Sequence, residues 1–253
     1  MCYDSNARPP EPPKTNGHAH GEDIVLTAKD STQFAAYVAS PSNPTGAQVI
    51  IYPDVRGLHQ FYKELALRFA ETGIRALAID YFGRTAGTST RDDSFEYMPH
   101  VQQTKLDTLF ADATAAFNYL RADGNTGPIF IVGFCFGGSL SLMTGREDFG
   151  QKGVIAFYAG LSRVFPGASG SVLDLAKDIH YPVLGLFGGA DAHIPVSDVQ
   201  KLDETLKQTG VEHEVLAYDG APHSFFDRRS TEFAEASSDA WTRVLNFITT
   251  HSK

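Results

Sequence analysis

The chain has 253 residues, of which 42% are hydrophobic and 20% are charged, and this balance excludes an intrinsically disordered protein. Single α/β domains routinely reach this length, so we expect one large core. The 21 basic residues against 30 acidic ones leave a net charge of −9, which argues against nucleic acid or an anionic membrane as the main partner.

The first 21 residues differ from the rest of the chain. Four prolines between Pro9 and Pro13 and few apolar side chains predict an extended N-terminal arm over residues 1–21. No apolar run approaches the roughly 20 residues that span a bilayer, and the start lacks the apolar stretch of a signal peptide. Two cysteines cannot build a disulfide framework. We therefore expect a cytoplasmic protein with one domain over residues 22–253.

Short apolar runs that alternate with helical segments begin at residue 23. The first two runs, 24–28 and 34–39, flank a turn and predict a pair of strands. The later runs are almost uninterrupted Val, Ile, Leu and Phe, which is typical of strands buried on both faces of a parallel sheet. These later runs are residues 48–52, 75–79, 129–134, 154–158, 183–187 and 214–218.

Three segments carry apolar side chains at the helical period of 3.6 residues. They span about residues 106–120, 199–206 and 231–248, and Gly210 closes the second of them. Strand–helix alternation after an initial strand pair predicts a doubly wound, mostly parallel sheet of about eight strands. Right-handed crossovers then place helices on both faces of this sheet.

Two connections, residues 83–100 and 160–170, are long and polar for links within a compact domain. Loops of this kind often cover an active site. Surface decoration is the alternative interpretation.

Residues 131–139 are the most informative segment, because a predicted strand ends there in G-x-C-x-G and passes into a helix. This is the nucleophile elbow of G-x-S-x-G hydrolases with sulfur in place of oxygen. The sharp turn strains the backbone of Cys135, and Gly133 and Gly137 leave it room. Its Sγ would stand beside a helix N-terminus, which favours thiolate, while the N–H of Phe136 would face a developing oxyanion. A small buried apolar cysteine is the alternative.

A catalytic thiol needs a base and a group that orients the base. In elbow hydrolases the acid and the histidine follow the nucleophile along the chain, on loops after later strands. Asp191 and His223 each follow a predicted strand, so they share the sheet edge of Cys135. His193 is a weaker candidate for the base, and Asp219 a weaker one for the acid. No histidine pair has the H-x-x-x-H spacing of a zinc helix, so we expect neither metal nor cofactor.

From about residue 22 to its end the sequence resembles the dienelactone hydrolase family of α/β-hydrolases. The motifs that carry the resemblance are the glycine-flanked Gly133–Gly138 segment, Gly189-Ala190-Asp191 and His223-Ser224-Phe225-Phe226. The resemblance implies an α/β-hydrolase fold and a Cys135–His223–Asp191 triad. It also implies a second oxyanion N–H, from Val55 in the turn after the third strand.

The family also carries an activating carboxylate and arginines that bind the substrate carboxylate. Asp54 stands where the family usually has Glu, so its reach is shorter by about 1.5 Å, and a turn-forming Asp is the alternative. Arg84 aligns with the first arginine. Asp227 replaces the second, and Arg228 follows it, so either Arg228 substitutes or the anion site is weaker. Tyr158 either lines the pocket or belongs to the core.

The resemblance implies a hydrolase that opens an enol lactone or activated ester through a thioester on Cys135, as in the degradation of aromatic compounds. Because a thiolate leaves more readily than an alkoxide or amide nitrogen, we expect poor amidase activity and a substrate that is a small, carboxylate-bearing lactone. A broad carboxylesterase for neutral esters, with Phe82, Phe134 and Phe136 lining its pocket, is one alternative. A non-catalytic binding or redox-sensing module is the other. We expect a monomer or small homo-oligomer.

Overall fold

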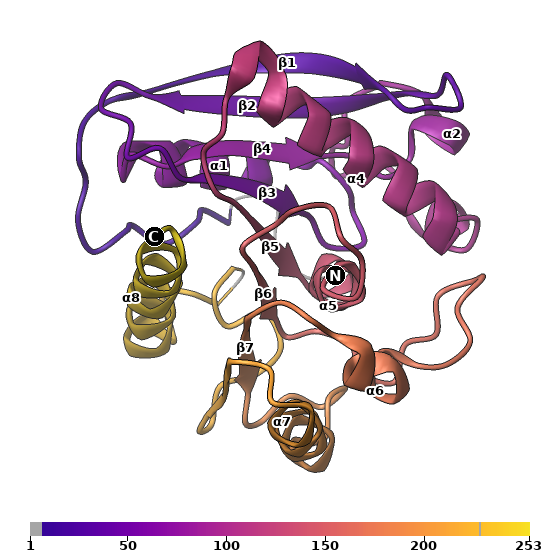
Figure 1. Cartoon of the computed structure of the whole chain (residues 1–253), viewed down its shortest axis with the longest axis vertical. Helices are drawn as coiled ribbons and strands as arrows, with labels where there is room; N and C mark the ends of the chain where they lie inside the picture. The colour runs from indigo at the N-terminus through magenta and orange to yellow at the C-terminus, as the bar shows by residue number, and fades with distance from the viewer. Residues whose placement is uncertain (1–6, 228) are drawn as a thin grey trace.

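The centre of the molecule is a single sheet. The computed structural model describes residues 7–227 and 229–253, and within them eight strands form the order β1-β2-β4-β3-β5-β6-β7-β8 (Figure 1). The strands are β1 Ala19–Thr27, β2 Gln33–Pro41, β3 Gln48–Tyr52, β4 Arg75–Ile79, β5 Ile129–Phe134, β6 Gly153–Phe157, β7 Val183–Gly188 and β8 His213–Tyr218. Strand β2 runs antiparallel to β1 and β4, and the remaining pairs are parallel. The predicted mostly parallel sheet is confirmed.

Helices cover both faces of the sheet, as predicted. The helices are α1 Gln60–Glu71, α2 Gly83–Ala86, α3 Met98–Val101, α4 Leu106–Arg121, α5 Phe136–Thr144, α6 Val172–Leu175, α7 Val196–Thr209 and α8 Ala234–His251. Helices α1 and α8 lie on one face, where Phe69 and Trp241 meet edge to face with ring centroids 4.7 Å apart. Helices α5, α6 and α7 lie on the opposite face from α8 (Figure 1).

The central strands form the core. Strands β3, β5, β6 and β7 are buried along their whole length, whereas β8 at the edge of the sheet is partly exposed. Uninterrupted apolar runs therefore correspond to strands covered on both faces. The site described below depends on this arrangement, because the parallel strands end at one common edge.

Strand β1 begins earlier than the sequence pattern indicates. Its pairing with β2 extends to Ala19 opposite Pro41, inside the segment predicted as an arm. The side chains of residues 19–23 are exposed or half-buried, so this first part of β1 lacks the apolar signal by which residues 24–28 were predicted.

Residues 7–18 contain no helix or strand, but they pack against the domain. The indole N–H of Trp241 donates to the carbonyl of Pro10 at 2.8 Å. The N–H of Asn16 donates to the carbonyl of Glu71 at 2.6 Å, at the end of α1. These contacts hold the extended segment against α1 and α8.

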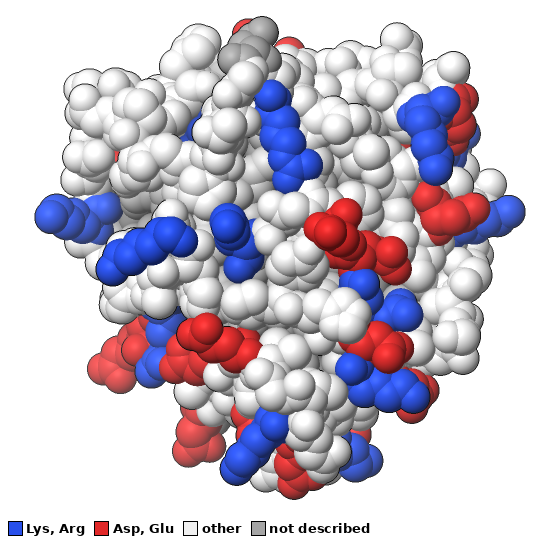
Figure 2. Space-filling model, in the orientation of Figure 1, with Lys and Arg blue, Asp and Glu red and all other residues white. Residues whose placement is uncertain are grey.

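The surface carries charges of both signs. On the face shown in Figure 2, Lys and Arg side chains are interspersed with Asp and Glu. Because the two signs are mixed, that face carries no continuous basic surface that could attract a polyanion. In the part of the chain that the structure describes, no helix combines the length and apolar character needed to span a bilayer.

Candidate active site

The elbow lies between β5 and α5. Cys135 has φ 53° and ψ −109°, a conformation that L-residues rarely adopt, and its N–H donates to the carbonyl of Phe157 at 3.0 Å. A Cβ on Gly133 would lie 2.0 Å from the carbonyl oxygen of Gly137, and a Cβ on Gly137 would lie 2.1 Å from that of Tyr52. Glycine at both positions therefore lets α5 begin directly against the ends of β5 and β3.

The acid and the histidine follow β7 and β8. Nδ1 of His223 lies 2.7 Å from Oδ2 of Asp191, and Oδ1 of Asp191 accepts the N–H of His193 at 2.8 Å. Cys135, Asp191 and His223 thus stand after three parallel strands at the same sheet edge. His193 contributes its backbone N–H to Asp191, and it is the ring of His223 that meets the carboxylate.

The Asp191 carboxylate is buried, whereas about a fifth of the His223 side chain (21%) is exposed. Burial alone would raise the pKa of Asp191, but the hydrogen bond and charge of His223, together with the N–H of His193, hold that pKa below its ordinary value. Asp191 therefore stays ionised at neutral pH. A carboxylate bound to Nδ1 fixes the His223 ring and leaves Nε2 as the nitrogen that faces away from Asp191.

The two predicted oxyanion donors lie on adjoining segments. Phe136 is the first residue of α5, and Val55 lies in the turn after β3. The hydroxyl of Tyr81 donates to the carbonyl of Pro53 at 2.8 Å, and its ring lies 5.1 Å from the ring of Phe136. A Cβ on Gly137 would also lie 2.4 Å from the carbonyl oxygen of Pro53. The start of α5 and the turn that carries Val55 are therefore in direct contact.

Asp54 is fully buried in that turn. Its Oδ1 accepts the N–H of Arg56 at 2.8 Å. This is the contact of a turn-forming aspartate, the alternative to an activating carboxylate. Burial, and next the neighbouring Tyr52, raises the pKa of Tyr81 well above its usual value. The carboxylates of Asp54 and Asp80 raise the pKa of Tyr81 further.

A buried ion pair that was not predicted from the sequence supports the same turn. Asp80 follows β4 and pairs with Arg91 at 2.9 Å, and neither side chain is more than 1% exposed. The two Asp80 oxygens also accept the N–H groups of Leu58 and Phe82, at 3.0 and 2.9 Å. The pair thereby ties the connection after β4 to the turn that carries Val55. An aspartate directly after a buried parallel strand is the signal that points to such a role.

Arg84 is held by carboxylates of its own chain. Its guanidinium donates to both oxygens of Asp112 at 2.8 and 2.6 Å and to Asp30 at 3.0 and 2.9 Å. These contacts join α2 to α4 and to the turn between β1 and β2. Because two carboxylates already neutralise the guanidinium, this arrangement does not favour Arg84 as a ligand for a substrate carboxylate. Arg228, the other predicted ligand, lies outside the described residues.

Arg84→Met is expected to lower the free energy of unfolding by about 2–3 kcal/mol at pH 8, because it leaves the buried Asp112 without its cation and Arg84 itself is one-fifth exposed (20%). Burial raises the pKa of Asp112 to about 6, although Arg84 opposes this shift. At pH 5 the carboxyl of the variant is therefore protonated and the loss is smaller. Denaturant unfolding at both pH values measures this difference, and Arg84→Met with Asp112→Asn serves as the control that regains stability. An equal loss of unfolding free energy at pH 8 and pH 5 would contradict the prediction that Arg84 stabilises an ionised Asp112.

Tyr158 packs between the catalytic ring and the core. It follows β6 with φ 35°, its ring centroid lies 4.9 Å from that of His223, and its hydroxyl donates to Oδ2 of Asp227 at 2.6 Å. Asp227, which the resemblance places where an arginine is expected, thus accepts a hydrogen bond from a buried tyrosine. Tyr158 is a buried residue with a satisfied hydroxyl that also contacts the histidine.

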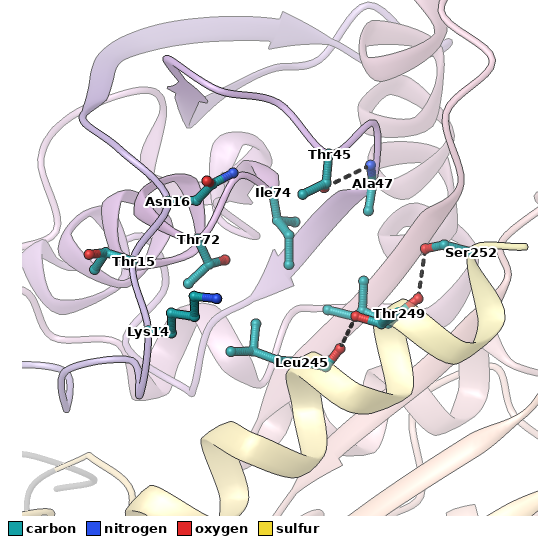
Figure 3. A pocket seen from close by; sticks show the side chains of 11 residues that line it. Lys14, Thr15, Asn16, Thr45, Ala47, Thr72, Ile74, Leu245, Thr249 and Ser252 are labelled. Atoms are coloured by element: carbon teal, nitrogen blue, oxygen red, sulfur yellow. Dashed lines mark hydrogen bonds between the residues drawn. The ribbon is translucent and has the colours of Figure 1, made fainter.

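A cavity of about 400 Å³ lies far from these residues. Lys14, Leu245 and the residues that precede β3 and β4 line it, including Thr45 and Thr72 (Figure 3). The strands begin at this edge of the sheet, whereas Cys135 and His223 stand where the strands end. The cavity is therefore separate from the candidate active site. Among the described residues, no group of three or more His, Cys, Asp or Glu side chains is arranged to hold a metal ion.

Comparisons with known proteins agree with this architecture. The model of the dienelactone hydrolase family matches residues 34–252. Two relatives named "putative carboxymethylenebutenolidase", from Yersinia pestis and Methylorubrum extorquens, are 28% and 29% identical over 94% and 92% of this chain and 91% and 81% of their own.

Solved structures show the same fold. A structure from Klebsiella pneumoniae named "putative dienelactone hydrolase" has a TM-score of 0.78 and 24% identity. The match covers 91% of this chain and 98% of that one. A dienelactone hydrolase-like promiscuous phosphotriesterase from metagenomic libraries has a TM-score of 0.76 and 23% identity, covering 94% and 100%. These likenesses establish an α/β-hydrolase fold for the chain.

Proposed function

The chain belongs to the dienelactone hydrolase family and is a hydrolase, and from this premise we propose that it opens enol lactones or activated esters through a Cys135–His223–Asp191 triad. The observation that carries the proposal is the 2.7 Å contact of His223 with a buried, ionised Asp191, at the sheet edge that also bears the strained Cys135. Relatives named for carboxymethylenebutenolidase activity support the same reaction class.

In the proposed first half-reaction, Nε2 of His223 accepts the proton of the Cys135 thiol, and the thiolate attacks the substrate carbonyl carbon. A carbon–sulfur bond forms, and the N–H groups of Phe136 and Val55 stabilise the negative oxygen. Collapse of this intermediate breaks the bond to the leaving oxygen, which takes a proton from His223. Asp54 contributes by closing the turn that presents the Val55 N–H.

In the second half-reaction, water hydrolyses the thioester. His223 accepts a proton from the water as its oxygen attacks the thioester carbonyl, and the same two N–H groups hold the second tetrahedral anion. Collapse breaks the carbon–sulfur bond, releases the acid and returns the proton to sulfur. Asp191 keeps the His223 ring oriented and stabilises its charged form through both halves.

Sulfur restricts the substrates that this mechanism serves. A thiolate is a better leaving group than an alkoxide or an amide nitrogen, so the tetrahedral intermediate returns to substrate unless the leaving oxygen is itself stabilised. An enol lactone or an activated ester meets this condition. A broad esterase that prefers neutral esters is the second candidate, because Arg84, one of the predicted ligands for a substrate carboxylate, is neutralised within the chain.

The test is a comparison of kcat/KM for a dienelactone carboxylate, its methyl ester, a p-nitrophenyl ester and the corresponding anilide. We expect the lactone and ester to exceed the anilide by roughly 100-fold or more, since differential transition-state stabilisation must favour the better leaving group. Mass spectrometry of the quenched reaction should find the acyl group on the peptide that contains Cys135. Absence of hydrolysis of all four substrates would reject the proposal, and preference for the methyl ester would favour the neutral esterase.

A further inference from the structure

The loop after β6 lies directly against the nucleophile elbow. The hydroxyl of Ser139, in the first turn of α5, donates to the carbonyl of Gly160 at 3.1 Å. The N–H of Arg163 donates to the same carbonyl at 3.2 Å, and the carbonyl of Arg163 accepts the N–H of Val172 at 2.9 Å. The backbone of Arg163 is therefore held in a turn beside the start of α5.

The side chain of Arg163 lies over the residue that follows the nucleophile. Its guanidinium carbon is 5.0 Å from the centroid of the Phe136 ring and 5.9 Å from that of Phe165. The side chain is half-buried, and its Nε is buried without a hydrogen-bond partner among the described residues. A planar guanidinium stacked on aromatic rings keeps its N–H groups directed outward along its edge, where they can bind an anion.

Other arginines at this end of the sheet are paired with carboxylates. Arg56 pairs with Asp93, Arg91 pairs with Asp80, and Arg84 pairs with two aspartates. Within residues 7–227 and 229–253, Arg163 forms no such ion pair. In a chain of net charge −9, it is a positive group beside the elbow that the protein does not itself neutralise.

We propose that Arg163 binds the carboxylate of an anionic ester or lactone whose carbonyl oxygen is held by the N–H groups of Phe136 and Val55. This assignment rests on the proposed function and names its substrate class. Because Phe136 provides both the N–H and the ring under the guanidinium, the substrate is small and its carboxylate lies within a few bonds of the reacting carbonyl. Arg163 then supplies the positive charge that the resemblance led us to expect from Arg84 and from the position that Asp227 occupies.

The experiment uses two p-nitrophenyl esters with the same leaving group, the anionic mono-p-nitrophenyl glutarate and its neutral methyl ester, and follows release of p-nitrophenol. The quantity measured is the ratio of kcat/KM for the anionic ester to kcat/KM for the neutral one, in the wild type, Arg163→Gln and Arg163→Glu. Arg163→Met keeps the stem against the rings without the charge, and replaces Arg163→Gln if that variant does not fold. Arg146→Gln is the matched control, because Arg146 pairs with Asp178 beyond the end of α5 at 3.7 Å.

We expect the ratio to fall roughly 10- to 100-fold in Arg163→Gln, mainly through KM, and further in Arg163→Glu, because a charge-assisted bidentate contact is lost. The wild-type ratio should also fall as salt rises, and the Arg163→Gln ratio should not. A purely structural role would lower both rates together, so an unchanged ratio in Arg163→Gln would overturn the proposal. If the ratio falls in Arg84→Met and is unchanged in Arg163→Gln, the substrate carboxylate would be assigned to Arg84. Failure of the wild type to hydrolyse either ester would instead reject the proposed function.

Discussion

Cys135→Ala is expected to lower kcat/KM for an activated ester by about 10⁴-fold or more, because removal of the nucleophile from a triad leaves only the oxyanion hole and substrate binding. The sulfur stands on a strained residue between β5 and α5. Initial rates with a p-nitrophenyl ester, at enzyme concentrations matched by absorbance and checked for folding by circular dichroism, measure the loss.

The chain offers a matched control for the thiol. Its second cysteine is Cys2, which lies outside the described residues. Iodoacetamide should inactivate the wild type and Cys2→Ala alike, with protection by substrate. Cys135→Ser keeps the size of the side chain and should lose most activity, because His223 must then deprotonate an alcohol. Substantial activity in Cys135→Ala, or inactivation that disappears in Cys2→Ala, would contradict a catalytic role for Cys135.

Asp191→Asn is expected to lower kcat by about 10³–10⁴-fold while leaving the fold intact, since a carboxamide at this place favours the wrong histidine tautomer. The amide would donate to Nδ1 of His223, so that Nε2 carries the proton and cannot accept one from Cys135. Asp219→Asn is the matched control, because Asp219 is an exposed aspartate after the neighbouring strand and should leave kcat unchanged. Equal losses in the two variants would contradict the assignment of Asp191.

The pH dependence of the same pair follows from the lowered pKa of Asp191. Burial opposes this shift, but the contacts with His223 and the His193 N–H outweigh it, so Asp191 stays ionised down to below its usual pKa of 3.8. The acid limb of kcat/KM in the wild type should therefore lie above that value, because Asp191 is still ionised there. A depressed acid pKa contributes stability that is present above the unfolded pKa and lost as pH falls through the folded one. Asp191→Asn should accordingly lose less stability on acidification than the wild type.

Local patterns were sufficient to predict the fold and the three proposed catalytic positions. The apolar runs identified the central strands β3, β5, β6 and β7 because these strands are buried on both faces. The elbow could be predicted because its glycines are required sterically within a few residues of Cys135. Asp191 and His223 required only the order of strands and the rule that parallel strands end at one edge. These features depend on neighbours in sequence or on chain topology.

Side-chain partnerships could not be predicted in this way. Arg84 binds Asp112, which is 28 residues away in the sequence, and Tyr158 binds Asp227, which is 69 residues away. No local spacing in the sequence therefore predicts either contact. The sequence shows that arginines and carboxylates are present, but the packing of α2 on α4 and of the β6 loop on α5 decides which charges cancel. By itself the sequence thus determined the sheet, the elbow and the strand ends that bear Asp191 and His223. Only the tertiary structure decided that Arg84 is neutralised and Arg163 is not, because electrostatic pairing depends on distances in space between segments far apart in the chain.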